Sequence, residues 1–279
     1  MHPVLFWIGS FPIHGYGAMG ALAFVVGAGI CLLRGTRQGM DRERLADVIF
    51  WMAITSLLGA RVVFLLQNPQ YVHSVADLFD MRGGGLVFYG SFLVGIPVGF
   101  ALMRRYRLPA FAVWDIFATA FPLSHAISRI GCFLAGCCYG LPTDVPWAVT
   151  FPADQPLAPP GIPLHPTQLY EAGALLLIGL ATNLFHRHRK FDGQVFLLYL
   201  VLYAIARAAL ESFRGDVDRG WFLPEVFGEA LSFSQGMSVV FAGVALVVFF
   251  WGARRQARRD AERLAVGASI RGPVAPDQA

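Results

Sequence analysis

Three charged residues near the end of an apolar run have the spacing of an anion-binding helix face. Arg207, Glu211 and Arg214 stand at positions i, i+4 and i+7, which lie on one side of a helix. Arg207 and Glu211 can form an ion pair, which leaves Arg214 free or shared. Arginine binds phosphate through two parallel donors and keeps its charge when partly desolvated. The set therefore predicts a site for an anionic lipid headgroup or, alternatively, an ion pair that locks two helices together.

A second polar group opens the apolar run at 167–186. Its sequence is His165-Pro166-Thr167-Gln168-Leu169-Tyr170-Glu171. Proline near a helix start, with Thr167 as the N-cap, predicts a helix entrance here. Gln168 and Glu171 are three residues apart and face one way, so they could form a polar wall beside the arginine face. The alternative is a capped helix start with a carboxylate that reaches toward water. His165 alone is more typical of a packed interfacial histidine than of a base.

Three cysteines lie close together in the segment 128–140. Cys132, Cys137 and Cys138 have the spacing C-x4-C-C, with His125 upstream. This spacing fits no standard zinc pattern, so we expect no metal and interpret the cysteines as part of a packed, glycine-rich loop. A redox pair is an alternative, although a disulfide between neighbours is strained. Cys31 lies far away in the first apolar run, so the four cysteines form no disulfide framework.

Further candidate residues lie at the corresponding ends of other apolar runs. They are Tyr16, Arg61 and Tyr89, the last in the glycine-rich segment 83–90. Glycine permits unusual dihedral angles and close backbone approach. At membrane depth such a segment lines a cavity or is buried in protein; close helix packing is the simpler interpretation. The shared level of all these residues predicts one composite site that faces the outer leaflet.

The composition indicates that these residues are held by membrane-spanning helices. The chain has 279 residues, of which 56% are hydrophobic and 14% charged, with a mean hydropathy of +0.56. Soluble domains carry about 25% charged residues. The net charge of +4 does not indicate nucleic acid, because the basic residues mostly cap apolar runs, as cytoplasmic loops require.

Runs of about 20 apolar residues, enough to cross a bilayer, predict an all-α protein with seven transmembrane helices. Basic clusters follow the first, third, fifth and seventh runs, which predicts an outside N-terminus and a cytoplasmic C-terminus. We expect a membrane domain over 1–253 with outer loops at 67–84, 128–166 and 213–234. The basic tail 254–279 is expected to form a surface helix that frays into disorder. The expected spans are 14–34, 45–66, 85–103, 110–127, 167–186, 193–212 and 235–253.

The ordered motifs of this chain resemble those of one enzyme family, prolipoprotein diacylglyceryl transferase. The resemblance covers residues 10–253 and rests on Tyr16-Gly17, Gly59-x-Arg61, Gly84-Gly85-Leu86…Gly90, Arg129-Ile130-Gly131-x-Phe133, His165-Pro166-x-Gln168-Leu169-Tyr170-Glu171 and Arg207…Glu211-x-x-Arg214. It implies a seven-helix protein of the bacterial cytoplasmic (inner) membrane. Such an enzyme moves the diacylglyceryl group of phosphatidylglycerol to the thiol of a lipobox cysteine in a prolipoprotein signal peptide. Glycerol-1-phosphate leaves, and no cofactor is expected.

The resemblance also implies roles for individual residues. Arg129 and Arg207 match two essential arginines of the family and would stabilise the leaving phosphate, while Glu211 would orient Arg207. Tyr89 completes the expected catalytic set. The expected substrate-binding residues are Tyr16, Arg61, Arg129, His165, Gln168, Glu171 and Arg214.

Three positions depart from the family pattern. Tyr89 stands where the family usually has a histidine that is a proposed base, Cys132 where it has asparagine, and Cys137 where it often has glutamate. Free tyrosine titrates near 10 and is a poor base at neutral pH. Either a base is dispensable, or His165 or His125 serves, or the chain is a paralogue with another acceptor. A non-catalytic protein that binds anionic phospholipid is a further alternative, whereas a transporter lacks support because no inverted repeat is present.

Overall fold

The computed structural model describes residues 4–72, 74–79, 85, 87–153, 157–215 and 232–270, and this part of the chain is mostly helical. The long helices are α1 (Gly15–Arg37), α2 (Arg42–Gln67), α3 (Phe88–Arg105), α4 (Ala110–Ala135), α5 (Thr167–His186), α6 (Gln194–Glu211) and α8 (Phe233–Ile270). Six of them, all except α3, are long and apolar enough to cross a membrane. The prediction of an all-α polytopic membrane protein is confirmed at this level, while the count of seven spans and the orientation stay predictions.

Short elements connect these helices. Two antiparallel hairpins are formed by β1 (Val4–Ile8) with β2 (Phe11–His14), and by β3 (Val149–Thr150) with β4 (Pro163–Leu164). Two 3-10 helices, η1 (Pro69–Tyr71) and η2 (Val75–Leu78), follow α2. The sequence interpretation did not predict either hairpin.

The chain divides into two compact units. The first, unit 1, comprises Met1–Phe24 and Phe117–Ala279, and the second, unit 2, comprises Val25–Ile116. The boundaries fall inside α1 and α4, so each of these helices contributes to both units. Each unit is described by itself below.

Unit 2 is built on the packing of α2 against α3. Asp41 caps α2, because its side chain accepts a hydrogen bond from the amide of Arg44 at 3.0 Å. Farther along, a Cβ atom added at Gly59 would lie 2.5 Å from the carbonyl oxygen of Gly90. The two backbones can approach this closely only because both positions lack a side chain. This confirms close helix packing as the role of Gly90, the last residue of the glycine-rich segment.

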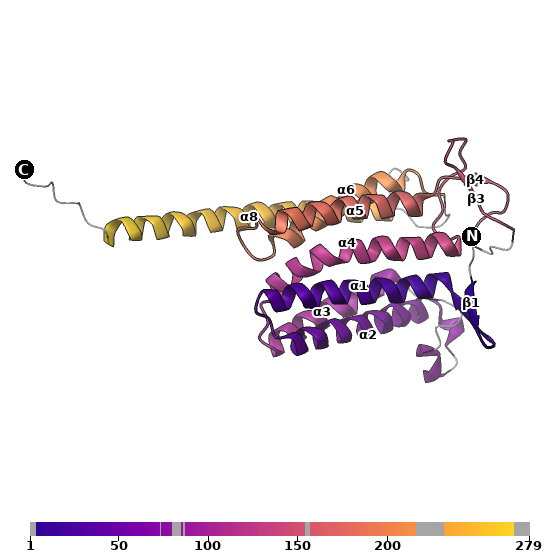
Figure 1. Cartoon of the computed structure of the whole chain (residues 1–279), viewed down its shortest axis with the longest axis horizontal. Helices are drawn as coiled ribbons and strands as arrows, with labels where there is room; N and C mark the ends of the chain where they lie inside the picture. Colours follow the sequence, from indigo (N-terminus) through magenta and orange to yellow (C-terminus); the bar gives the residue numbers. More distant parts are fainter. Residues whose placement is uncertain are drawn as a thin grey trace, which may run out of the picture. The chain divides into compact units, whose positions relative to one another are not determined.

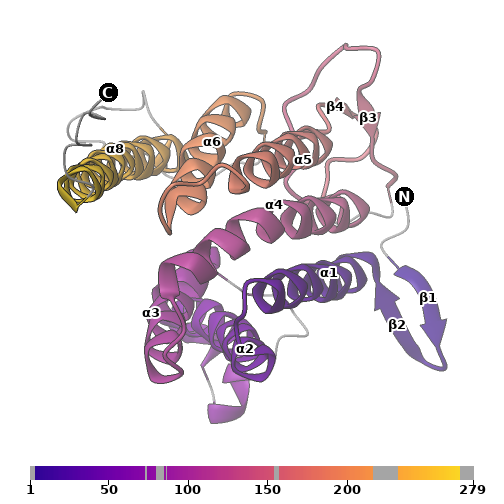
Figure 2. The same cartoon turned by 60° about the vertical axis from the view of Figure 1, so that its left-hand side comes forward.

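Unit 1 contains α5, α6 and α8, and Figures 1 and 2 show α8 running alongside α6. A buried cluster of Ala118, Ile178, Val195 and Tyr199 joins α4, α5 and α6. At the far end, a Cβ atom at Gly252 would lie 2.9 Å from the ring of Phe191. Helix α8 thus packs closely over the turn between α5 and α6.

Helix α4 is longer than predicted. The sequence suggested a span that ends at 127 and an outer loop from 128, but α4 continues to Ala135, so this part of the loop prediction is wrong. Pro122 lies inside the helix, and membrane helices tolerate proline where neighbouring groups satisfy the backbone. One turn before Pro122, the Asn183 side chain of α5 donates to the carbonyl of Thr119 at 3.0 Å. The proline therefore lies within a helix that a neighbouring helix contacts through a side-chain hydrogen bond, and it does not interrupt α4.

Helix α8 also exceeds its predicted span of 235–253. It continues without a break to Ile270, so the first part of the basic tail extends α8 rather than forming a separate element. Residues 271–279, the remainder of the tail, lie outside the described part of the chain.

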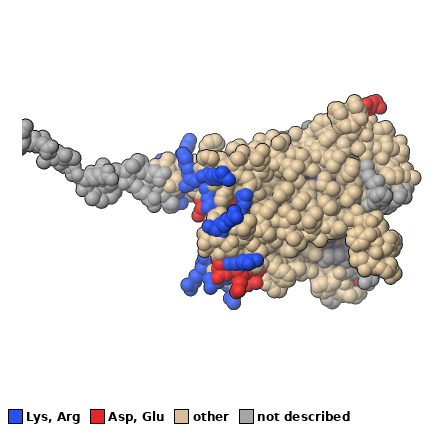
Figure 3. All heavy atoms as spheres, viewed as in Figure 1, with Lys and Arg blue, Asp and Glu red and all other residues tan. Residues whose placement is uncertain are grey.

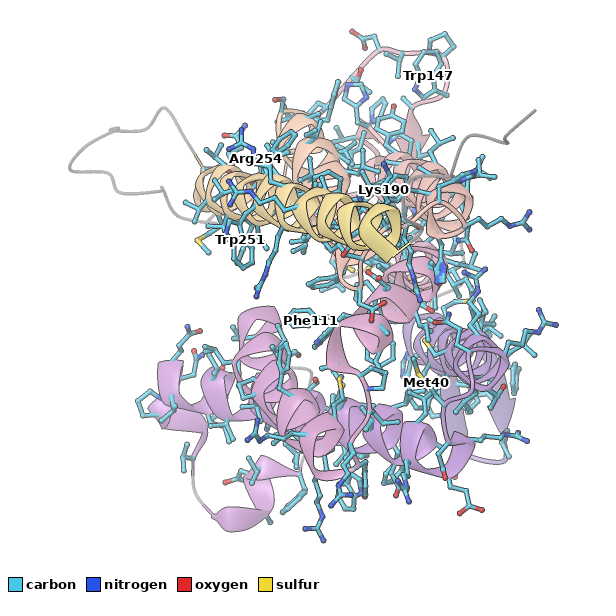
Figure 4. The ribbon with its side chains drawn as sticks, turned by 90° about the vertical axis from the view of Figure 1, so that its left-hand side faces the viewer. Met40, Phe111, Trp147, Lys190, Trp251 and Arg254 are labelled. Carbon is cyan, nitrogen blue, oxygen red and sulfur yellow. The ribbon has the colours of Figure 1, made fainter. Side chains whose placement is uncertain are left out.

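Basic side chains gather at one end of the helices within each unit (Figure 3). In unit 2 they lie where α1 ends and α2 begins, at Arg34, Arg37, Arg42 and Arg44. In unit 1 they lie at the turn after α5 and on α8, where Figure 4 labels Lys190, Trp251 and Arg254. The guanidinium of Arg255 lies over the ring of Trp251 at 5.2 Å. This pattern is what the positive-inside rule expects of cytoplasmic helix ends.

Candidate active site

Arg129 on α4 and Glu171 on α5 form a buried ion pair. Nη2 of Arg129 lies 3.1 Å from Oε1 of Glu171, and the side chains are only 15% and 6% exposed. Removing one member of such a pair is costly, because the other is left as a buried, unpaired charge. The pair joins two helices and fixes the direction of the Arg129 guanidinium.

His125 and Tyr203 brace this ion pair from two sides. Nε of Arg129 donates to Nε2 of His125 at 3.2 Å, and the hydroxyl of Tyr203 on α6 donates to Oε1 of Glu171 at 3.5 Å. The rings of His125 and Tyr203 are 5.7 Å apart. Because Nε2 of His125 accepts from Arg129, the proton of the neutral imidazole is on Nδ1. His125 is thus a poor candidate for the base considered from the sequence.

Arg207 and Glu211 form the second buried ion pair, one turn apart on α6. The side chains are again 15% and 6% exposed, so the pair predicted from the i, i+4 spacing is confirmed. Tyr203 interacts electrostatically with Glu171, Arg129 and Arg207. The two ion pairs therefore belong to one polar cluster, held by α4, α5 and α6 in the apolar interior of unit 1.

The segment after α4 folds back onto the end of α6. Gly140 forms an isolated antiparallel bridge with Arg214, and its amide donates to the carbonyl of His165 at 3.0 Å. A Cβ atom at Gly140 would lie 2.7 Å from the carbonyl oxygens of both His165 and Phe213. Only glycine fits between the two main-chain segments at His165 and Phe213. Arg214 and His165, predicted separately, are brought together by this backbone contact.

His165 takes part in an aromatic network rather than standing alone. Its Nδ1 lies 3.1 Å from the hydroxyl of Tyr170, which also accepts a hydrogen bond from Nε1 of Trp147 at 2.6 Å. The ring of His165 packs edge-on against Phe213 at 5.4 Å. These contacts agree with the interpretation of a packed interfacial histidine. Figure 4 shows Trp147 on the loop that carries this network.

Thr167 and Gln168 hold the cysteine segment. Thr167 is the first residue of α5 and its hydroxyl donates to the carbonyl of Cys138 at 2.7 Å, so its prediction as the N-cap is wrong: the hydroxyl serves a distant carbonyl. Nε2 of Gln168 donates to the carbonyl of Cys137 at 2.7 Å, and the side chain is buried. Oε1 of Gln168 has no partner among the described residues.

Tyr16 lies at the beginning of α1, close to α4. A Cβ atom at Gly131 would lie 3.3 Å from the Cα atom of Tyr16, so glycine lets the two helices approach here. Tyr16 is half exposed and interacts electrostatically with Arg129 and with the three cysteines. The structure thus brings Tyr16 to the same region as the arginine cluster.

Arg61 and Tyr89 belong to unit 2. Nε of Arg61 donates to the carbonyl of Asp77 at 3.0 Å, and Nη1 donates to that of Gly85 at 3.1 Å. The residue is buried, and its guanidinium lies over the ring of Phe64 at 5.3 Å. Tyr89 is the second residue of α3, and its side chain, like residues 80–84 and 86, lies outside the described part.

The three cysteines form a compact cluster where α4 ends. All three Sγ atoms lie within 4.8 Å of one another, and Nη1 of Arg129 lies 3.9 Å from Sγ of Cys132. Hydrogen bonds from Cys132 and Cys137, with the charges of Arg214 and Arg129, hold the pKa of Cys138 well below its usual value. Hydrogen bonds with Cys132 and Cys138, together with burial, raise the pKa of Cys137.

Comparison with known proteins identifies the group to which this arrangement belongs. The sequence model of the family "prolipoprotein diacylglyceryl transferase" matches residues 3–251. The chain belongs to this family. It is similar to the phosphatidylglycerol–prolipoprotein diacylglyceryl transferases of Clostridium tetani (30% identity, 89% of this chain and 97% of the relative), Geobacter sulfurreducens (34%, 83% and 90%) and Legionella pneumophila (31%, 91% and 98%). The resemblance inferred from the motifs is confirmed, and with it the class of enzyme.

In this member of the family, α4, α5 and α6 supply a cationic cluster in an apolar setting. Arg129 and Arg207 each have a carboxylate partner, and Arg214 adds a third positive charge beyond the end of α6. Two of the bracing residues, His125 and Tyr203, were not assigned these roles from the sequence. The spacing of His125 four residues before Arg129 was the available signal, whereas Tyr203 is aimed at Glu171 only by helix packing.

Proposed function

We propose that the chain transfers the diacylglyceryl group of phosphatidylglycerol to the thiol of a lipobox cysteine in a prolipoprotein signal peptide. In this step the thiolate sulfur attacks a glyceryl carbon of the lipid. The carbon–oxygen bond to phosphate breaks, its electron pair leaves with glycerol-1-phosphate, and a thioether forms. The observation that carries the proposal is the buried cluster of two Arg–Glu pairs on α4, α5 and α6, in a chain whose relatives are named for this reaction.

The two arginines have distinct geometric support. Arg129 is fixed by contacts from another helix, Glu171, and from its own helix, His125, whereas Arg207 is paired with Glu211 within α6. Charge that develops on the leaving phosphate would meet donors already held in position, and such preorganisation is an effective source of rate enhancement. Glu171 and Glu211 act by orienting the guanidinium groups.

A strong dedicated base is not required by this chemistry. A lipobox cysteine with an ordinary pKa near 8.5 is already thiolate in about one molecule in thirty at pH 7. Nearby arginines would raise that fraction, since a positive charge favours the thiolate. The replacement of histidine by Tyr89 is compatible with transfer on this view.

The proposed setting is the bacterial inner membrane, with seven spans, the N-terminus outside and the site toward the outer leaflet. The basic helix ends of both units support this orientation (Figure 3). Reporter fusions after residues 37, 105, 188 and 258 are expected to report cytoplasm, and fusions near 75, 150 and 220 the outside. An outside signal after 105 or 188 would contradict the proposed topology.

The function is tested by transfer of labelled diacylglyceryl from phosphatidylglycerol to a synthetic lipobox peptide. We expect a thioether product with the cysteine peptide and none with a serine peptide. Arg207→Gln should abolish transfer, whereas Arg42→Gln, an exposed arginine at the start of α2, serves as the matched control and should retain it. Absence of transfer by well-folded wild type would refute the lipobox acceptor.

A second candidate is a paralogue that transfers the same group to a different acceptor. It is favoured by Cys132 and Cys137, which replace polar residues of the family pattern: Cys132 lies beside Arg129, and Cys137 donates to the carbonyl of Cys132. It predicts that wild type cleaves phosphatidylglycerol and releases glycerol-1-phosphate in a membrane extract without modifying the lipobox peptide. Mass spectrometry of the lipidated product in that extract would separate the two candidates.

A further inference from the structure

We propose that Cys132, Cys137 and Cys138 form a binding site for a thiophilic metal ion of low coordination number, Cu(I). Sulfur atoms that share one metal ion at about 2.3 Å each lie roughly 4 Å apart. The three Sγ atoms here are all within 4.8 Å of one another, so small side-chain rotations suffice to bring them onto one ion. The three thiols adjoin Arg129 but take no part in the proposed transfer chemistry, which uses no thiol of the enzyme.

The backbone is shaped to hold this arrangement. Gly136 and Cys138 have positive φ angles of 72° and 61°, and the amide of Cys137 donates to the carbonyl of Cys132 at 3.1 Å. A left-handed cysteine is uncommon, and strain of this kind points to a function that requires it. Thr167 and Gln168 clamp the carbonyls of Cys138 and Cys137 from α5. Hydrogen bonds from α5 thus hold the turn in place, so its cysteines can bind a metal ion without a change in the backbone.

The ligand set favours Cu(I) over Zn(II). Structural zinc sites use four protein ligands in tetrahedral geometry, and the described residues offer no His, Asp or Glu that joins the three thiols at the same spacing. Soft thiolates select Cu(I), zinc and iron–sulfur clusters, and three thiolates leave a structural zinc site one ligand short. One Cu(I) with three thiolates carries a charge of −2, and Arg129 and Arg214 both interact with Cys138. Arg129 is also paired with Glu171, so these two arginines offset part of that charge, and the partly exposed Cys137 and Cys138 leave a path for the ion.

The probe is Cu(I) itself, added under anaerobic conditions to the reduced full-length protein in detergent with bicinchoninate as a competing chromophore. We expect one equivalent to be retained against the chelator. Cys132→Ser, Cys137→Ser and Cys138→Ser should each weaken binding by at least about tenfold, the lower end of what disturbed metal sites show. Cys31→Ser, a buried cysteine in α1, is the matched control and should bind as wild type does.

A second measurement needs no variant. Cu(I) should protect all three cysteines of wild type from alkylation together, as read by mass spectrometry of the peptides. Failure of folded wild type to retain Cu(I), retention by the triple serine variant, or alkylation rates that Cu(I) leaves unchanged would each overturn the proposal. Retention of Zn(II) but not of Cu(I) would overturn the choice of ion. Binding is read without the transfer assay, so its outcome is independent of the proposed function.

Discussion

Main-chain carbonyls and carboxylates both serve as acceptors for buried arginines in this molecule. In unit 2, Arg61 donates to the main-chain carbonyls of Asp77 and Gly85. In unit 1, Arg129 and Arg207 face the carboxylates of Glu171 and Glu211. Carbonyl acceptors tie the arginine to a particular loop conformation, whereas a carboxylate fixes the direction of a guanidinium, the group that binds phosphate through parallel donors. The contrast suggests a structural arginine in unit 2 and functional arginines in unit 1.

The largest expected effect is the loss of transfer activity when an arginine of unit 1 is replaced. Arg129→Gln should lower the rate of transfer by about 10²–10³-fold, as loss of a preorganised donor does. Arg207→Lys should also transfer poorly, because lysine keeps the charge but loses the planar fork. The measurement is labelled-lipid transfer to the lipobox peptide at saturating phosphatidylglycerol.

Stability must be separated from catalysis in this test. Arg129→Gln leaves Glu171 buried without its charged partner, which is destabilising. The control is the double variant Arg129→Gln/Glu171→Gln, which removes both charges and should recover thermal stability but not transfer. Recovery of transfer together with stability would mean that Arg129 is only structural, and the contrast between the units would fail.

The next effect concerns the packing of unit 2. Gly90→Ala should lower the free energy of unfolding by about 1–3 kcal/mol, the usual cost of overpacking, because the new methyl group would meet the backbone of Gly59. The matched control is Gly173→Ala in α5, where nothing lies within 4 Å of the added Cβ atom. That variant should gain about 0.5–1 kcal/mol, since alanine favours a helix over glycine. Thermal unfolding in detergent gives both values, and equal stability of the two variants would contradict the assigned close approach.

A smaller effect on transfer is expected at Arg61. Arg61→Gln should cost about 1–3 kcal/mol of stability, because it leaves a partly buried carbonyl of Asp77 or Gly85 without its donor. The activity of the folded fraction should fall far less than in Arg129→Gln. The comparison requires transfer rates normalised to folded protein, measured below the melting temperature of both variants. A loss of transfer as large as that of Arg129→Gln, in protein of unchanged stability, would assign Arg61 to the substrate instead.

The features that the sequence predicted well are those set by local periodicity. Apolar runs located the long helices, and the i, i+4 spacing identified the Arg207–Glu211 pair, because helix geometry alone places those residues together. The pairing of Glu171 with Arg129 was not predictable in this way, since it depends on how α5 packs against α4. The resemblance identified the family, because it depends on the order of motifs along the sequence and not on contacts between helices.

The failures have equally specific causes. Proline at 122 suggested an interruption, but α4 continues through it to Ala135, as membrane helices tolerate where neighbouring groups satisfy the backbone. The spacing of the cysteines fits no standard zinc pattern and predicted a packed loop, whereas the three Sγ atoms lie within 4.8 Å of one another on a turn with left-handed backbone at Gly136 and Cys138. Motif spacing is measured along the chain, whereas the contacts among the cysteines and between α4 and α5 depend on turns and helix packing.

The smallest expected effect is at Tyr89, the clearest departure from the family pattern in unit 2. If substrate thiolate is available without a dedicated base, Tyr89 contributes at most a neutral hydrogen bond, worth about 0.5–1.5 kcal/mol. Tyr89→Phe should then lower transfer by less than about tenfold, and Tyr89→His should be tolerated. The assay is labelled diacylglyceryl transfer to the lipobox peptide, with both variants beside wild type and Arg207→Gln. A collapse in Tyr89→Phe comparable to that in Arg207→Gln would show that unit 2 supplies a catalytic group, and the division between a structural and a functional unit would no longer hold. The paralogue alternative predicts a third pattern, in which neither wild type nor any variant at position 89 modifies the peptide. The patterns are distinct because, under the proposed function, the arginines stabilise the leaving phosphate, whereas Tyr89 would contact the headgroup or the acceptor.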